Sequence, residues 1–246
     1  MRIIDLSQEI FSGSPVYRGH QPTVVHRLKS VERLPDGKWT FAINGLFLSD
    51  HCATHTDSFQ HMDPNPEAKA IHELPLDMFQ GLAVCLDVSQ AEPGEFITAD
   101  MLEEAARRAG VDFSGPRSPK VVLLYTGHYV RTFPKPAYGN KHPGLDRKAT
   151  EWLADRGVIN IGIDCASVDV EPHKGDEWKP AHSVCRERGI LNTENLGDLR
   201  EVAGRQFWYM GLPLKIVGGT AGPIRAVAIL LDEEDLETCK YLANLK

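Results

Sequence analysis

The chain has 246 residues, of which 42% are hydrophobic and 25% charged, as is typical of globular proteins. Its formal net charge of −7, without any long block of lysine or arginine, argues against nucleic acid as a partner. No stretch has the length of apolar sequence that a membrane span or a signal peptide requires, so no membrane partner is expected. The five scattered cysteines form no C-x-x-C pair and indicate reduced thiols, hence a cytoplasmic protein.

The first half of the chain predicts mainly strands. Residues 2–6 indicate a short strand, and alternating apolar residues over 39–47 indicate a longer one that ends near Ser49. Three short runs rich in β-branched residues predict buried strands at 81–88, 120–125 and 158–163.

Two helices are expected between these strands. Thr98 is the predicted N-cap of a helix over 99–109, and Asp146 that of a helix reaching 156; a glycine ends each. Strands at 207–216 and 224–231, joined by a glycine-rich turn at 218–223, precede a surface helix over 232–245. The sequence therefore predicts one domain, residues 1–246, of the mixed α+β class, whose sheet is not purely parallel and is flanked by helices.

Histidine is concentrated in the stretch HCATHTDSFQH, which contains His51, His55, Asp57 and His61. Imidazole and carboxylate groups are the usual ligands of zinc, manganese or iron. On a helix, Asp57 would lie about 200° round from the two histidines; on a flat strand, His51 and His55 would lie roughly 13 Å apart. The segment must therefore bend if it binds one ion. A chance gathering of surface or core histidines is the alternative.

The same stretch resembles the signature H-x-G-T-H-x-D-x-P-x-H of the cyclase family, which includes bacterial kynurenine formamidases and isatin hydrolases. Further similar segments follow the family order along nearly the whole chain: Asp5-Leu-Ser, Pro75-Leu-Asp, Tyr125-Thr-Gly, Pro143-Gly-Leu, Gly162-Ile-Asp-Cys-Ala-Ser-Val-Asp and the block 212–227. The resemblance implies a swivelling β/β/α fold and a homodimer or larger homo-oligomer.

The resemblance also implies roles for individual residues. The metal ligands would be His51, His55 and Asp57, with Asp57 able to bridge two ions, and His182 and Glu194 would complete a second site. The cofactor would be Zn²⁺ or Mn²⁺, one or two ions per chain. His61 would donate and accept protons, and Tyr17 would contact the substrate.

Two departures from the family pattern concern the substrate. Ala53 replaces a glycine where the backbone conformation is expected to be unusual, and Ser58-Phe59 replaces Ala-Pro, which adds a ring.

Three further residues are substrate-binding candidates: Phe59, Thr220 and His128. For Thr220, a plain turn is the alternative. Cys52 is a weak candidate nucleophile, because metal-bound histidines are poor bases. The remaining histidines, His20, His26, His72, His142 and His173, are expected at the surface.

These residues predict a metal-dependent hydrolase that cleaves the C–N bond of a small, aromatic amide or lactam. A bound cation makes hydroxide available near neutral pH, and His61 is suited to carry a proton to the leaving nitrogen. A ring-forming or dehydrating cyclase of secondary metabolism is one alternative. A metal-binding scaffold without turnover is another, and the presence of His61 and Glu194 beside the ligands argues against it.

Overall fold

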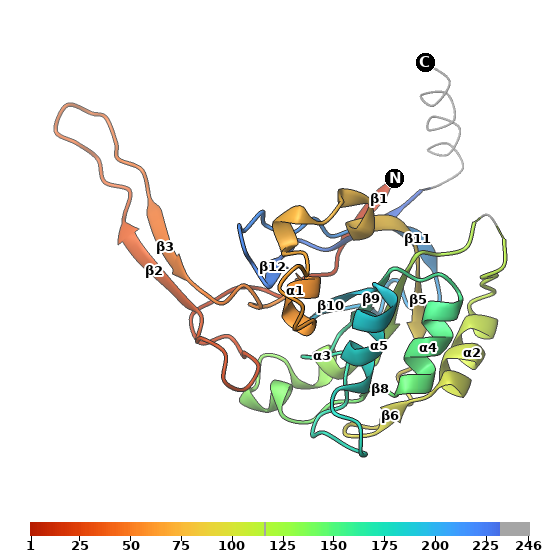
Figure 1. Ribbon diagram of the computed structural model, residues 1–246. Helices are drawn as coiled ribbons and strands as arrows, with labels where there is room; N and C mark the ends of the chain where they lie inside the picture. The colour runs from red at the N-terminus through yellow and green to blue at the C-terminus, as the bar shows by residue number, and fades with distance from the viewer. Residues whose placement is uncertain (116, 232–246) are drawn as a thin grey trace.

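A nine-stranded mixed sheet forms the centre of the molecule in the computed structural model, which describes residues 1–115 and 117–231 (Figure 1). The strand order is β1-β13-β11-β5-β7-β9-β10-β4-β12. In chain order these strands are β1 (Arg2–Asp5), β4 (His55–Asp57), β5 (Gln80–Asp87), β7 (Val121–Tyr125), β9 (Asn160–Ile163), β10 (Leu191–Glu194), β11 (Gln206–Met210), β12 (Ala221–Pro223) and β13 (Val227–Leu230).

Parallel pairing is confined to the middle of this sheet. Strands β5, β7, β9 and β10 are parallel, whereas every pairing outside them is antiparallel. The carboxyl ends of β9 and β10 therefore meet at one edge, where side chains of several segments converge. The predicted mixed α and β class, with a sheet that is not purely parallel, is confirmed.

Three helices cover one face of the sheet: α2 (Ala99–Arg108), α4 (Arg147–Asp155) and α5 (Pro180–Arg188) (Figure 1). Both predicted caps are present, because the Thr98 hydroxyl accepts from Met101 N at 3.4 Å and the Asp146 carboxylate accepts from Ala149 N at 2.7 Å. No helix within the described residues is long and apolar enough to span a membrane.

Alternating side chains of the central strands build two cores. Val84 and Leu86 of β5 pack with the three helices, whereas Ala83 and Cys85 pack on the opposite face. That second core includes Tyr209 of β11 and residues of β1 and β13, so the sheet curls around it. No residue of the histidine-rich stretch 51–61 belongs to these two cores, which leaves its side chains free to face the edge of the sheet.

Several elements differ from the sequence prediction. The strand expected at 207–216 ends at Met210, and residues 221–223 of the expected turn form β12 against β4. The sequence analysis did not predict β4, β10 or α5; β4 has only three residues and α5 contains little apolar sequence. The helix expected at 232–245 lies outside the described residues.

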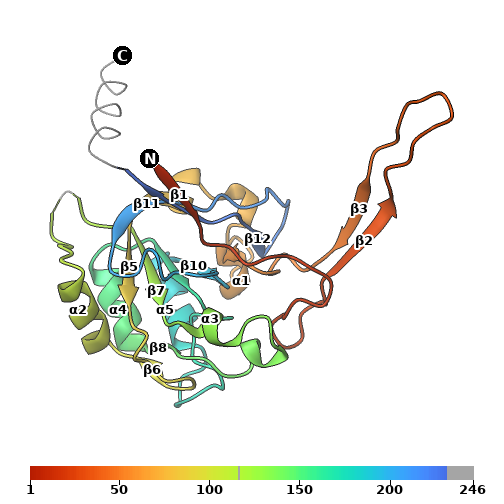
Figure 2. The same ribbon diagram turned by 180° about the vertical axis from the view of Figure 1, so that it is seen from behind.

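A hairpin projects from this body (Figures 1 and 2). It consists of β2 (Val24–Lys29), β3 (Ile43–Phe47) and the connection between them, and we call residues 24–47 the arm. The strand predicted from residue 39 begins only at Ile43, because residues 39–42 belong to the arm's outer part.

The remaining short elements are α1 (Phe59–Met62), η1 (Ile71–Glu73), η2 (Leu76–Phe79), β6 (Phe96–Ile97), α3 (His128–Thr132), η3 (Pro136–Gly139) and β8 (Gly144–Leu145).

Candidate metal centre

The short strand β4 places two of the motif residues inside the sheet. Its pairing with β10 sets Glu194 directly opposite His55, and its pairing with β12 sets Ala221 opposite Asp57. Positions two apart on a strand share a face, and directly opposed residues on neighbouring strands lie in contact. His55, Asp57 and Glu194 therefore meet on one face, and each is buried.

His51 reaches the same point because the chain bends before β4. Ala53 adopts a φ of 50°, a left-handed conformation that glycine takes more readily than alanine. The bend brings His51 Nδ1 to 3.0 Å from Asp57 Oδ1. The bend that the spacing predicted is therefore present, at the position where this chain departs from the family glycine.

Three buried atoms of this cluster have no hydrogen-bond partner among the residues that the structure describes: His55 Nε2, Asp57 Oδ1 and Asp57 Oδ2. The other ring nitrogen, His55 Nδ1, lies 2.8 Å from Ala53 O and donates to it, which leaves Nε2 with a free lone pair. Buried acceptors are rarely left without a donor unless an ion or water meets them. Their chemistry and convergence fit a divalent cation.

Ligand atoms gather in two groups that share Asp57. His55, Asp57 and Glu194 form one group and His51, Asp57 and His61 the other, with all ligand atoms of a group within 4.8 Å of one another. His182 Nε2 lies 3.5 Å from Asp57 Oδ2 and 3.6 Å from Glu194 Oε1. A carboxylate common to two groups could supply an oxygen to a cation in each. The structure thus brings together every residue that the sequence analysis named as a ligand.

Asp169 orients His182 and was not identified as a site residue from the sequence. One of its carboxylate oxygens accepts from Ala181 N at 2.8 Å, and the other accepts from His182 Nδ1, which directs His182 Nε2 toward Asp57 and Glu194. Gly144 makes this position accessible, because a Cβ there would lie 2.1 Å from the Asp169 carbonyl carbon. The only signal in the sequence was the family-like segment that ends at Asp169.

Asp169→Asn is expected to weaken cation binding by roughly 10- to 100-fold, as is usual when the carboxylate behind a ligating histidine is lost. The asparagine amide would donate toward His182 Nδ1 and so favour the tautomer that carries its proton on Nε2. Competition with a chelating dye measures the affinity. Asp146→Asn is the matched control, because Asp146 also caps a helix but contacts no histidine; equal affinity in both variants would contradict this role of Asp169.

Electrostatics distinguish the two central carboxylates. Burial raises the pKa of Asp57, but the nearby imidazoles of His182, His51 and His55 outweigh this effect and hold the pKa well below its usual range. Burial, followed by the charge of Asp57, raises the pKa of Glu194. Asp57 is therefore the ionised centre of the cluster.

His61 lies at the open side of the cluster. It is in α1, and its ring centroid is 4.3 Å from that of His51 and 5.7 Å from that of His182. Burial, opposed by the charge of Asp57 and assisted by the neighbouring His51 and His182, lowers the pKa of His61 to about 4. The imidazole is consequently neutral at pH 7 and able to accept a proton.

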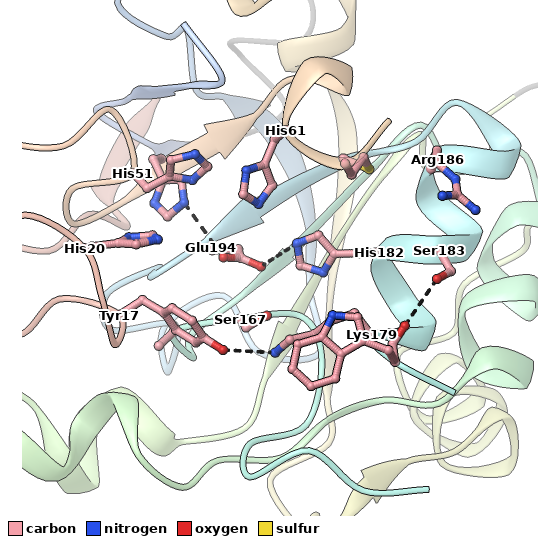
Figure 3. A pocket seen from close by; sticks show the side chains of 14 residues that line it. Tyr17, His20, His51, His61, Ser167, Lys179, His182, Ser183, Arg186 and Glu194 are labelled. Carbon is pink, nitrogen blue, oxygen red and sulfur yellow. Dashed lines mark hydrogen bonds and ion pairs between the residues drawn. The ribbon is translucent and has the colours of Figure 1, made fainter. Parts of the chain in front are cut away.

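The cluster opens into a cavity of about 390 Å³. Figure 3 shows His51, His61, His182 and Glu194 on one side of it and Tyr17 and Lys179 on the other. Tyr17 donates its hydroxyl to Glu171 at 3.1 Å and accepts from Lys179 Nζ at 3.1 Å. The other residues that line the cavity are His20, His55, Met62, Ala166, Ser167, Trp178, Ser183 and Arg186.

Two histidines lie elsewhere than the sequence analysis expected. His20, expected at the surface, lines the cavity with its ring centroid 5.3 Å from that of His51. His142, also expected at the surface, is fully buried. Neither residue belongs to a recognisable spacing, because long-range packing alone places them.

The other proposed substrate contacts lie outside the lining of this cavity. The Thr220 hydroxyl donates to Asp50 at 2.9 Å and accepts from His51 Nε2 at 3.0 Å, so it holds the proposed ligand His51 in place. Phe59 packs against a small core that contains Ile71. His128 is fully buried, and its Nε2 lies 2.7 Å from Tyr138 O.

The fold and this cluster together define a member of the cyclase family, whose model matches residues 4–170. The chain belongs to that family, as the sequence motif predicted. It is 31% identical to a kynurenine formamidase of Paracidovorax citrulli over 223 residues, which cover 91% of this chain and 94% of the relative. An isatin hydrolase of Roseibium aggregatum is 25% identical over 229 residues, 88% and 84% of the two chains. A crystal structure of an isatin hydrolase bound to the product analogue thioisatinate shares the fold, with a TM-score of 0.81, 22% identity and coverage of 94% and 93%.

Proposed function

We propose that this protein is a metal-dependent hydrolase that cleaves a C–N bond of a small aromatic amide or lactam. One observation carries the proposal: His55 Nε2 and both Asp57 carboxylate oxygens are buried without partners beside a cavity of about 390 Å³. The similarity to a kynurenine formamidase and an isatin hydrolase supports the choice of an amide bond.

The cation site comprises His51, His55, Asp57, His182 and Glu194, with Asp57 shared between two positions. One or two Zn²⁺ or Mn²⁺ ions per chain are proposed, because imidazole and carboxylate ligands suit both ions. A bound divalent cation activates water at neutral pH and polarises a carbonyl oxygen.

The chain's own residues handle the proton and the substrate. His61, neutral because burial lowers its pKa to about 4, accepts a proton on its imidazole and delivers it to the leaving nitrogen. Tyr17, fixed between Lys179 and Glu171, offers its ring to an aromatic substrate. Thr220 and Asp50 hold His51 in place from behind.

Elemental analysis of protein purified without chelator, paired with hydrolysis of formyl-kynurenine and isatin, tests this function. We expect one or two equivalents of zinc or manganese and hydrolysis of at least one of these linear and cyclic amides. Chelation should abolish turnover, and the cation should restore it. Protein that binds the cation but hydrolyses neither amide would instead support the ring-forming or the scaffold alternative.

Three further proposals concern the domain organisation, the location and the assembly of the protein. We propose that residues 1–246 form one domain and that the protein acts in the cytoplasm, which is consistent with Cys52, Cys85, Cys165 and Cys185 being free thiols. A homo-oligomer is proposed from the family resemblance.

A further inference from the structure

Arg186 lines the cavity but has no part in the chemistry described so far. It belongs to α5, one turn after the proposed ligand His182 and three residues after Ser183, and side chains at these spacings are neighbours on a helix. Figure 3 shows Ser183 and Arg186 beyond His182, on the side of the cavity away from His51. Both residues therefore border the part of the cavity that a substrate would reach beyond its scissile bond.

The guanidinium of Arg186 lacks the close carboxylate partner that its neighbours have. Among the described residues, its one ion pair is a long contact, in which Glu187 Oε1 lies 3.9 Å from Arg186 Nη2. That carboxylate already accepts two hydrogen bonds from Arg147, both at 3.0 Å. Arg188, two positions farther along α5, is in contrast paired with Asp155 at 2.5 Å. Because a guanidinium has five N–H donors, Arg186 keeps donors available for a ligand in the cavity.

Positive charge dominates the cavity wall. Among the described residues that line it, Lys179 and Arg186 are cationic, and Glu194, a proposed cation ligand, is the only carboxylate. Lys179 adopts a φ of 50°, a left-handed conformation that is unfavourable for lysine, and its Nζ lies 3.1 Å from the Tyr17 hydroxyl. Glu171, whose carboxylate lies 3.4 Å from that Nζ, is not among the lining residues. A cation at the cluster would add to this charge, so the cavity favours an anionic ligand.

Apolar surface lies next to these cationic groups. Trp178, which is 68% exposed, lines the cavity together with Met62, and its ring centroid lies 5.5 Å from Lys179 Nζ. Ser183 Oγ donates a long hydrogen bond of 3.5 Å to Trp178 O, so it can turn toward a ligand at little cost. Aromatic rings stack favourably on such side chains. The wall therefore suits a ligand that combines a ring with an acidic substituent.

We propose that Arg186 and Ser183 bind a carboxylate of the substrate, so that this protein acts on aryl amides with an acidic group across the ring from the scissile C–N bond. A guanidinium and a carboxylate match each other in a pair of parallel hydrogen bonds, and the Ser183 hydroxyl can donate to the same group. The Cβ atoms of residues one turn apart lie about 5–6 Å from each other, and the long arginine side chain extends that reach beyond His182.

The same cations exclude other substituents at this end of the cavity. An ammonium group would lie beside Arg186 without a carboxylate to compensate it, which costs binding energy. Formyl-kynurenine carries an ammonium group beside its carboxylate, and isatin carries neither, so an acid without a neighbouring ammonium distinguishes the substrate of this chain from both. The inference rests on the proposed hydrolase function for the bond that is cleaved, whereas binding of the carboxylate can be measured without turnover.

Two formamides that differ in one substituent test this specificity. In 4-formamidobenzoate and 4-methylformanilide the scissile bond is the same, and a carboxylate or a methyl group lies across the ring. With saturating cation, we expect the wild-type kcat/KM to favour the carboxylate by at least about 10-fold. Arg186→Gln should lower kcat/KM for 4-formamidobenzoate by roughly 10- to 100-fold, mainly through KM, as for the loss of a hydrogen bond to a charged group.

Three further variants show whether charge at this position is responsible. Arg186→Lys should keep part of the preference, because an ammonium is a point charge without the two-point geometry of a guanidinium, and Arg186→Glu should reverse it. Arg188→Gln removes the same charge from the same helix and should behave as the wild type, because Arg188 is paired with Asp155 and does not line the cavity. Circular dichroism shows that all variants are folded.

Binding of the product amines separates this subsite from the hydrolase function. Isothermal titration of the cation-loaded protein with 4-aminobenzoate and 4-methylaniline requires no turnover. Tighter binding of 4-aminobenzoate, weakened about 10-fold or more by Arg186→Gln, supports the subsite even if neither formamide is hydrolysed, a result that would count against the hydrolase function alone. Equal binding of 4-aminobenzoate to the wild type and Arg186→Gln, as for a carboxylate bound by the cation itself, overturns the subsite. So does hydrolysis of 4-formamidobenzoate at the same kcat/KM by both proteins, which would leave the hydrolase function standing.

Discussion

Asp57→Asn is expected to abolish both cation binding and hydrolysis. Asp57 Oδ1 lies 3.0 Å from His51 Nδ1 and 3.4 Å from His55 Nε2, and Asp57 Oδ2 lies 3.5 Å from His182 Nε2, so this carboxylate is common to both ligand groups. An amide removes the negative charge and replaces one acceptor by a donor. We expect kcat/KM to fall by at least about 10⁴-fold. Enzymes accelerate their reactions by at least about 10⁶-fold over the uncatalysed rate, and in a metal-dependent hydrolase the cation supplies much of this acceleration.

Elemental analysis and single-substrate kinetics on the same preparation measure the effect. Asp63→Asn is the matched control, since the Asp63 carboxylate accepts from Asn65 N in a nearby loop and, among the described residues, is bonded to none of the proposed ligands. The control should retain its cation and its rate. If Asp57→Asn kept a full complement of cation, Asp57 would not be the shared ligand.

His61→Gln is expected to keep the cation and lose rate, by roughly 10²–10⁴-fold in kcat, the usual contribution of a general acid–base group. Because burial lowers the pKa of His61 to about 4, the wild-type imidazole stays neutral down to that region and becomes unable to accept a proton below it. With saturating cation, wild-type activity should therefore decline as the pH falls toward about 4. The variant should lack that limb of the profile.

This substitution also decides between two roles for His61. Its position in the group with His51 and Asp57 is compatible with a ligand as well as with a proton carrier. Loss of cation from His61→Gln would make it a ligand and remove it from the proton transfer. His72→Gln is the control, because His72 lies outside the cavity and accepts from Gly218 N at 3.3 Å.

The local features of the fold were predictable from the sequence, and the pairings at the edge of the sheet were not. Thr98 and Asp146 identify helix starts through their own side chains and the next few residues, so local sequence suffices. The strand β12 exists because residues 221–223 pair with β4, more than 160 positions earlier. The arm shows the same limit: its alternating pattern over residues 39–47 indicated a strand, but not that His20 before the arm and His51 after it line the same cavity.

The residues of the candidate site likewise fall into those that the sequence indicated and those that only the structure places. The spacing of His51, His55 and Asp57 required a bend, and Ala53 with a φ of 50° provides it. His182 and Glu194 were placed by resemblance, and the structure brings their side chains beside Asp57. Asp169 and His20 act through contacts between distant segments, and no short-range spacing distinguishes them from other polar residues.

The location of the ligands within the sheet has a consequence for how the cation is exchanged. His55, Asp57 and Glu194 belong to strands that backbone hydrogen bonds hold together, and β4 is paired on both of its edges. Small zinc modules, in contrast, fold only when the metal binds. We therefore expect the proposed cation to exchange while the chain remains folded. The ion that the protein carries would then be set by metal availability and affinity rather than fixed when the chain first folds.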